Sequence, residues 1–310
     1  MSFIKHVQSK LTHYANLVRL EHTIFALPFA MTALLLANLS TCFPSLNTLL
    51  WVILAMVGGR TYAMGLNRLA DAHLDALNPR TASREIPAGL VSQTEAWGLT
   101  IGALALMIFA VWQLPLLCKQ LLPVAVLILT LYSYTKRFTS LCHLVLGLAL
   151  GSSAIGGWLA QTGAWQGGLP ILFGASVALW VMGFDVIYAC QDTDFDRSQG
   201  LFSLPAQVGI ETALTLSRWM HVGSMLFLLI FAWQYSHSAY GFVGWGFCFA
   251  TVLMGILLIR EHRLVKADDL SRVNQAFFTL NGQISLGFFA FVLGERVLNF
   301  FLISQGLKTP

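Results

Sequence analysis

The chain reads NRLADAHLD at residues 67–75, at the end of a long apolar segment. On a helix Asn67, Asp71 and Asp75 are spaced four residues apart and lie on one face. A second acidic run ends another apolar segment, and helical spacing puts its polar members on one face: Asp185, Tyr188, Asp192 and Asp196. Like charges stacked in this way repel unless a cation lies between them, and all-oxygen ligands favour a hard ion such as Mg²⁺. Two such runs facing each other predict a binding site for a diphosphate.

The composition is that of a membrane protein. Apolar residues make up 56% of the 310 residues and charged residues only 10%, whereas globular proteins have about 25% charged residues. Apolar windows of about 20 residues predict nine membrane-spanning segments. These segments lie near 23–42, 48–67, 95–114, 119–135, 141–162, 169–190, 212–233, 240–260 and 280–301. We therefore expect an all-α, polytopic membrane protein that forms a single domain over residues 1–310.

Basic residues are distributed unevenly between the two sides of the predicted bundle. The connections 43–47, 163–168 and 234–239 contain no Lys or Arg, whereas the loops that follow the two acidic runs contain several. An excess of Lys and Arg marks the cytoplasmic side of a membrane protein. We expect both acidic runs to face the cytoplasm, and the net charge of +4 gives no reason to expect a nucleic-acid partner.

Several cations near the acidic runs have two interpretations. Arg60 lies two turns before Asn67 on the same helical face, where it can pair inside the protein or bind a substrate anion through its planar fork. Arg80 and Arg84 follow the first acidic run, and residues 132–137 read YSYTKR. Membrane anchoring explains each of these cations without any chemistry. Together with the acids, they are also the cations that a diphosphate would need.

Two other classes of protein remain open on composition alone. A transporter or channel that uses buried acids as a relay would place charged residues at several depths in the membrane. A structural scaffold would be indifferent to replacement of Asp71 or Asp192 by Ala. The clustering of the acids at helix ends, with long loops behind them, favours an enzyme over a transporter.

At these residues the sequence resembles the UbiA superfamily of intramembrane aromatic prenyltransferases. The family pattern is N-D-x-x-D-x-x-x-D after the second helix, Y-x-x-x-K after the fourth and D-x-x-x-D after the sixth. The matching residues are Asn67, Asp71 and Asp75, then Tyr132 and Lys136, then Asp192 and Asp196. Arg68 stands where the family usually has Asp. That position points away from Asn67 and Asp71 on a helix, so we expect the metal site to be retained.

The resemblance implies about nine transmembrane helices around a central cavity, in a bacterial inner membrane. It implies Mg²⁺-dependent transfer of a polyprenyl group from a polyprenyl diphosphate to an aromatic acid in quinone biosynthesis. The acceptor would be 4-hydroxybenzoate or 1,4-dihydroxy-6-naphthoate, and the bilayer would be the other partner.

The same resemblance implies a role for each site residue. The metal ligands would be Asn67, Asp71, Asp75, Asp192 and Asp196. The substrate-binding residues would be Arg84 and Lys136 at the diphosphate, with Arg60 and Tyr132. Arg60 and Asp185 would lie lower, at the acceptor. The expected catalytic residues are Asp71, Asp185 and Asp192.

Overall fold

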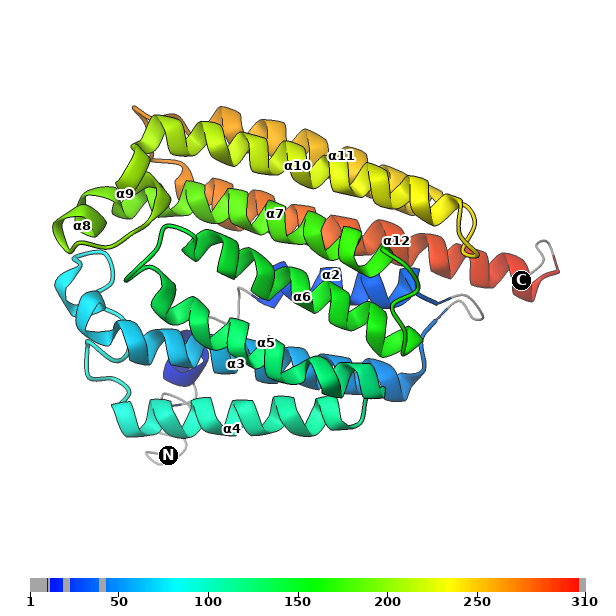
Figure 1. Cartoon of the computed structure of the whole chain (residues 1–310), viewed down its shortest axis with the longest axis horizontal. Coiled ribbons are helices and arrows are strands. Elements are labelled where there is room, and N and C mark those ends of the chain that lie inside the picture. The colour runs from blue at the N-terminus through cyan, green and yellow to red at the C-terminus, as the bar shows by residue number, and fades with distance from the viewer. Residues whose placement is uncertain (1–9, 11, 19–22, 39–42, 307–310) are drawn as a thin grey trace, which may run out of the picture.

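The computed structural model describes residues 10, 12–18, 23–38 and 43–306. These residues are almost entirely helical and contain no β-strand. Long helices lie side by side along the longest axis of the molecule and form an elongated bundle (Figure 1). The prediction of an all-α membrane protein is confirmed.

The long helices follow the order of the predicted segments. They are α2 (Thr23–Leu36), α3 (Leu46–Leu77), α4 (Gln93–Trp112), α5 (Leu116–Thr135), α6 (Cys142–Thr162), α7 (Leu169–Ala189), α10 (Ile210–Ser236), α11 (Trp245–Leu264) and α12 (Asn281–Ser304). Short elements lie between them: the 3₁₀ turn η2 (Cys190–Asp192), α8 (Thr193–Ser198), α9 (Leu204–Val208) and the π-helical turn η3 (Gln275–Leu280).

Within the described residues, seven helical stretches are long and apolar enough to cross a membrane. They are Leu46–Leu77, Gln93–Trp112, Leu116–Thr135, Cys142–Thr162, Leu169–Ser198, Ile210–Ser236 and Gln275–Ser304. Part of α2, Phe25–Leu36, is a shorter apolar helix, and α11 is not among the seven. The predicted count of nine spans is therefore not confirmed, although each predicted segment overlaps one helix. Residues 39–42 of the first predicted segment lie outside the described residues.

The connections fall at two opposite ends of the bundle, as the charge pattern predicts. The loop after α3 lies at the same end as α8 and α9, whereas the connections from α6 to α7 and from α10 to α11 lie at the other end (Figure 1). Helix caps define the loop after α3. The N–H of Asn78 bonds the carbonyl of Leu74 at 3.2 Å where α3 ends. Ser92 and Glu95 form a capping box where α4 begins.

The core is built from large aromatic side chains between α2, α6, α7, α10, α11 and α12. Its fully buried members include Phe29, Trp158, Phe173, Trp180, Phe231 and Phe288. Glycines bring α6 and α7 close together. A Cβ added to Gly151 would lie 2.5 Å from the carbonyl oxygen of Gly174, and one added to Gly147 would lie 2.5 Å from that of Ala178. This close approach sets the distance between side chains at the paired ends of α6 and α7.

Large apolar side chains on the outside of the bundle are exposed in positions that suit contact with lipid. On α10 they include Trp219, Leu226 and Trp233. Burying these side chains in hydrocarbon is favourable, and Trp is common at membrane interfaces.

Candidate active site

A cavity of about 950 Å³ lies among α2, α3, α5, α6 and α7. All the site residues predicted from the sequence line it: Arg60, Asn67, Asp71, Asp75, Arg84, Tyr132, Lys136, Asp185, Asp192 and Asp196. Its volume is of the size that ligand sites in proteins usually have. The structure thus brings the predicted residues to one cavity, and the role of each remains a prediction.

The cavity is polar at one end and apolar at the other. The acids and their cations lie near the end of α3 and in the loop after it, just after α5, and from the end of α7 into α8. The first half of α5 and the second half of α6 contribute apolar or small residues, including Leu121, Leu122, Ala125 and Gly156. The polar end suits a phosphate group, and the apolar end suits a hydrocarbon chain.

The first acidic run lies on one unbroken helix, as predicted. The amide of Asn67 donates to Asp71 Oδ2 at 3.3 Å. Asp71 and Asp75 are buried, with 3% and 5% of their surface exposed. Carboxylates this deeply buried need cationic partners.

Asp71 has two cationic partners from the end of α5. Lys136 Nζ lies 2.9 Å from Asp71 Oδ2, and Arg137 Nη2 donates to Asp71 Oδ1 at 2.7 Å. Arg137 also donates to the carbonyl oxygens of Ala70 and Ser133. The sequence singled out Lys136, and it left Arg137 open as a membrane anchor or as a cation for a diphosphate. Arg137 links α5 to the acidic run on α3.

Asp75 is paired with cations from two directions. Arg84 Nη1 donates to Asp75 Oδ1 at 2.6 Å, and Arg68 Nη1 lies 4.0 Å from Asp75 Oδ2. Within the described residues, Asp75 Oδ2 accepts no hydrogen bond. The sequence interpretation considered Arg68 only against Asn67 and Asp71. Its guanidinium lies instead beside Asp75, two turns further along α3, and Nε donates to the carbonyl of Leu17 at 3.2 Å.

The second acidic run does not lie on one continuous helix. The α-helix ends at Ala189, the 3₁₀ turn Cys190–Asp192 follows, and α8 begins at Thr193. The expectation of one unbroken α-helix is therefore wrong beyond Ala189. Asp185, Tyr188, Asp192 and Asp196 still line the same cavity, and the turn that interrupts the helix is only three residues long.

Asp192 is held by the loop that follows the first acidic run. Arg80 Nε donates to Asp192 Oδ1 at 2.8 Å, and Arg80 Nη2 forms a close ion pair with Oδ2. The amide of Asn78 donates to Asp192 Oδ1 at 3.1 Å, and Arg80 Nη1 donates to Tyr188 Oη at 3.2 Å. Burial lowers the pKa of Arg80, but the hydrogen bond and charge of Asp192, together with Tyr188, outweigh it, so the net shift is upward. Arg80 joins the two acidic runs, and the sequence did not assign it this role.

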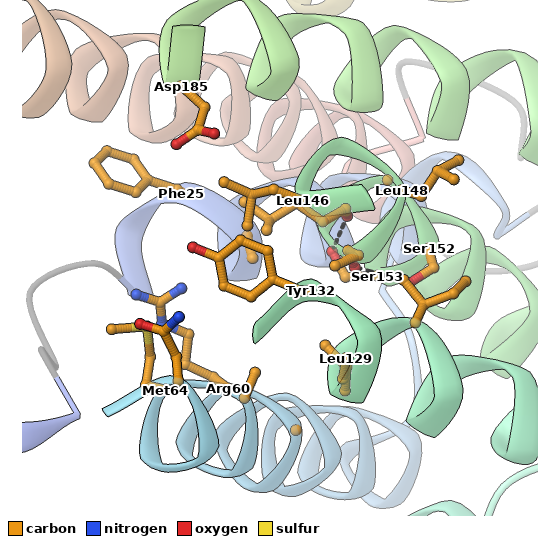
Figure 2. A pocket seen from close by; sticks show the side chains of 18 of the residues that line it. Phe25, Arg60, Met64, Leu129, Tyr132, Leu146, Leu148, Ser152, Ser153 and Asp185 are labelled. Atoms are coloured by element: carbon orange, nitrogen blue, oxygen red, sulfur yellow. Dashed lines mark hydrogen bonds between the residues drawn. The ribbon is translucent and has the colours of Figure 1, made fainter. Parts of the chain in front are cut away.

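Arg60, Tyr132 and Asp185 lie around the space beside these ion pairs. Figure 2 shows Asp185 and Arg60 on opposite walls of the cavity, with the ring of Tyr132 between them. They come from α7, α3 and α5, respectively. Asp185 Oδ2 lies 2.7 Å from His143 Nδ1 on α6, a partner that the sequence did not indicate. A cationic and an anionic side chain facing one space can orient a polar aromatic molecule.

The donor set at the polar end fits Mg²⁺. The acids of the two runs and Asn67 offer oxygen atoms, which hard cations prefer, and Asp75 Oδ2 is buried without a hydrogen bond among the described residues. Among the residues that the structure describes, no three His, Cys, Asp or Glu side chains are close enough together to form a metal site by themselves. Arg and Lys side chains balance the acids instead, so a metal ion would also need ligands from its substrate.

Comparisons with known proteins agree with this geometry. The model of the UbiA prenyltransferase family matches residues 26–283. A 4-hydroxybenzoate octaprenyltransferase of Vibrio cholerae is 33% identical over 213 residues, which cover 68% of this chain and 71% of that protein. A protein of the same name from Salmonella paratyphi B is 27% identical over 278 residues, covering 88% and 92% of the two chains.

Solved structures show the same fold. The apo structure of a UbiA homolog from Aeropyrum pernix K1 is 35% identical, with a TM-score of 0.77, and covers 91% of this chain and 98% of its own. A UbiA homolog from Archaeoglobus fulgidus, solved with GPP and Mg²⁺, is 20% identical, with a TM-score of 0.73. The match covers 92% of this chain and 99% of that one. The enzyme interpretation therefore replaces the transporter alternative. The chain is a multi-pass membrane prenyltransferase and belongs to the UbiA prenyltransferase family.

Proposed function

We propose that the protein transfers a polyprenyl group from a polyprenyl diphosphate to an aromatic acid, with Mg²⁺ as its cofactor. The observation that carries this proposal is the cavity itself, which has two acidic runs with their cations at one end and apolar walls at the other. The names of the Vibrio and Salmonella relatives and the GPP and Mg²⁺ in the Archaeoglobus structure support it. We place the protein in a bacterial inner membrane, with the polar end of the cavity toward the cytoplasm.

The polar end of the cavity would bind the diphosphate. Asn67, Asp71, Asp75, Asp192 and Asp196 would hold Mg²⁺, which when bound neutralises the leaving diphosphate. Lys136 and Arg84 each pair with one of these acids. When an acid binds the metal, its cationic partner becomes available to donate to a diphosphate oxygen.

Two further cations, Arg80 and Arg137, occupy equivalent positions beside Asp192 and Asp71. Preorganised donors aimed at developing negative charge stabilise the transition state in which the allylic C–O bond breaks. We therefore assign all four cations to this step.

The acceptor would lie between Arg60 and Asp185. An Arg fork matches a carboxylate with two parallel hydrogen bonds, so Arg60 would hold the acid group of the acceptor, and Tyr132 would form the wall beside the ring. When the allylic C–O bond breaks, its electron pair leaves with the diphosphate. A ring carbon then forms the new C–C bond to the allylic carbon, and Asp185 accepts the proton that this ring carbon loses.

The apolar walls would serve the rest of the substrate. They contact the polyprenyl chain through burial of its hydrocarbon surface. They also exclude water, which would otherwise react with the allylic cation.

The acceptor is tested by competition. Protein purified in detergent is given Mg²⁺, a polyprenyl diphosphate and an equimolar mixture of 4-hydroxybenzoate and 1,4-dihydroxy-6-naphthoate, and the prenylated products are separated by mass. The proposal expects prenylation of one acid in clear preference to the other. Failure of folded protein to prenylate either acid would overturn the proposed function.

A further inference from the structure

His143 holds the carboxylate of Asp185 from the neighbouring helix. His143 Nδ1 lies 2.7 Å from Asp185 Oδ2, and among the described residues it is the only hydrogen-bond partner of that side chain. His143 is 3% exposed, whereas the side chain of Asp185 is 20% exposed, and both residues line the cavity. Gly147, one turn after His143, lets α6 and α7 approach closely enough for this contact.

A backbone contact fixes which nitrogen of His143 carries the proton. The N–H of Leu204 donates to His143 Nε2 at 3.2 Å. A backbone amide can only donate, so Nε2 must be the acceptor and bear no hydrogen. The proton of the neutral imidazole is then on Nδ1 and points at Asp185. The imidazole ring therefore donates one hydrogen bond to the carboxylate of Asp185.

The segment that provides this contact also reaches the other half of the site. Phe202 N–H donates to the carbonyl of Lys136 at 2.8 Å, and Lys136 pairs with Asp71. Residues 202–204 therefore contact both Lys136, the partner of Asp71, and His143, the partner of Asp185. The orientation of His143 depends on the same segment that packs beside the diphosphate end.

We propose that His143 is a positioning residue for the prenyl transfer, one that holds the carboxylate of Asp185 oriented through the Nδ1–H bond. This assignment rests on the proposed function, in which Asp185 accepts the ring proton of the acceptor. His143 occupies Oδ2 and leaves Oδ1 for the substrate. The histidine keeps its own proton throughout, so no further proton carrier is required.

Two substitutions of His143 distinguish the roles of its two ring nitrogens. In His143→Asn the side-chain amide takes the place of Nδ1 and can still donate to Asp185. In His143→Gln the amide takes the place of Nε2. It can accept the hydrogen bond from Leu204 N–H but cannot donate one to Asp185. Positioning of Asp185 predicts that the Asn variant keeps kcat within a few-fold of wild type. The Gln variant should lose about 10- to 100-fold in kcat, since a hydrogen bond to a charged group is lost.

The KM of the diphosphate should be unchanged in both variants, because Asp185 lies beside the acceptor. In an Asp185→Asn background, His143→Gln should lower kcat little further, since the effect of the Gln substitution acts through the carboxylate of Asp185. His221→Gln is the matched control. His221 is equally buried, bonds His262 on α11 and does not line the cavity, so its kcat per folded protein should match wild type.

Prenyl transfer is measured with both candidate acids, and folding is measured by thermal unfolding in detergent. A Gln variant with wild-type kcat, or an Asn variant as slow as the Gln variant, would overturn the positioning role. Loss of activity in proportion to loss of folded protein would do the same. No transfer by folded wild-type protein would instead overturn the proposed function on which the assignment rests.

Discussion

Replacing Arg60 by Ala should weaken binding of the aromatic acid and leave binding of the diphosphate almost unchanged. Arg60 lines the cavity together with Tyr132 and Asp185 (Figure 2), and it lies on α3 three helical turns before Asp71. Its side chain is only partly exposed, so a carboxylate bound there is partly removed from water. A hydrogen bond between charged groups contributes about 1.5–3 kcal/mol in such a place, which corresponds to an increase in acceptor KM of about 10- to 150-fold.

The assay is steady-state prenyl transfer, with each substrate varied in turn at saturation of the other. Arg60→Lys is the first control, because it keeps the charge but loses the planar fork, and its effect should be intermediate. An acceptor analogue with a hydrogen in place of its carboxylate is the second control. The Ala variant should prenylate this analogue as well as wild type does. Unchanged acceptor KM in the Ala variant, or an effect mainly on diphosphate KM, would refute the carboxylate-binding role.

Three further substitutions test other parts of the site and the fold. Lys136→Ala should raise diphosphate KM about tenfold with little change in acceptor KM, the reverse of Arg60→Ala, and a change confined to the acceptor would contradict this assignment. Arg80→Ala removes the fork from Asp192 and should lower kcat/KM for the diphosphate more than Arg80→Lys does, as measured at saturating acceptor. Gly151→Ala places a Cβ 2.5 Å from the carbonyl oxygen of Gly174 and should destabilise the protein by about 1–3 kcal/mol. Gly102→Ala, where a Cβ would meet nothing within 4 Å, is its control, and equal melting temperatures for the two variants would argue against close α6–α7 packing.

Helical spacing predicted the first acidic run well because α3 is unbroken from Leu46 to Leu77. Four-residue spacing then places Asn67, Asp71 and Asp75 on one face, as observed. For the second run the assumption of an unbroken helix is wrong, since the 3₁₀ turn Cys190–Asp192 interrupts it, although the four polar residues still line one cavity. Nothing in residues 185–196 marks that turn with Pro or Gly, so local sequence gave no signal for it.

Contacts between residues far apart in the sequence could not be predicted. Arg137 and Arg80 have the composition and position of membrane-anchoring charges, and only the packing of α5 and the loop after α3 brings them to Asp71 and Asp192. His143 is 42 residues from Asp185, on a different helix. A helical pattern orders residues along one element, whereas these partners are set by how elements pack.

The central claim is Mg²⁺-dependent transfer of a polyprenyl group to an aromatic acid at the two acidic runs. The most direct test measures the mass of the product formed by purified protein from a polyprenyl diphosphate and the preferred acid, with Mg²⁺ or with EDTA. The same measurement is made on Asp71→Ala and Asp192→Ala. We expect prenylated acid only from wild type with Mg²⁺, with EDTA and both substitutions abolishing it. Full product formation in EDTA, or wild-type turnover by either folded variant, would contradict the account.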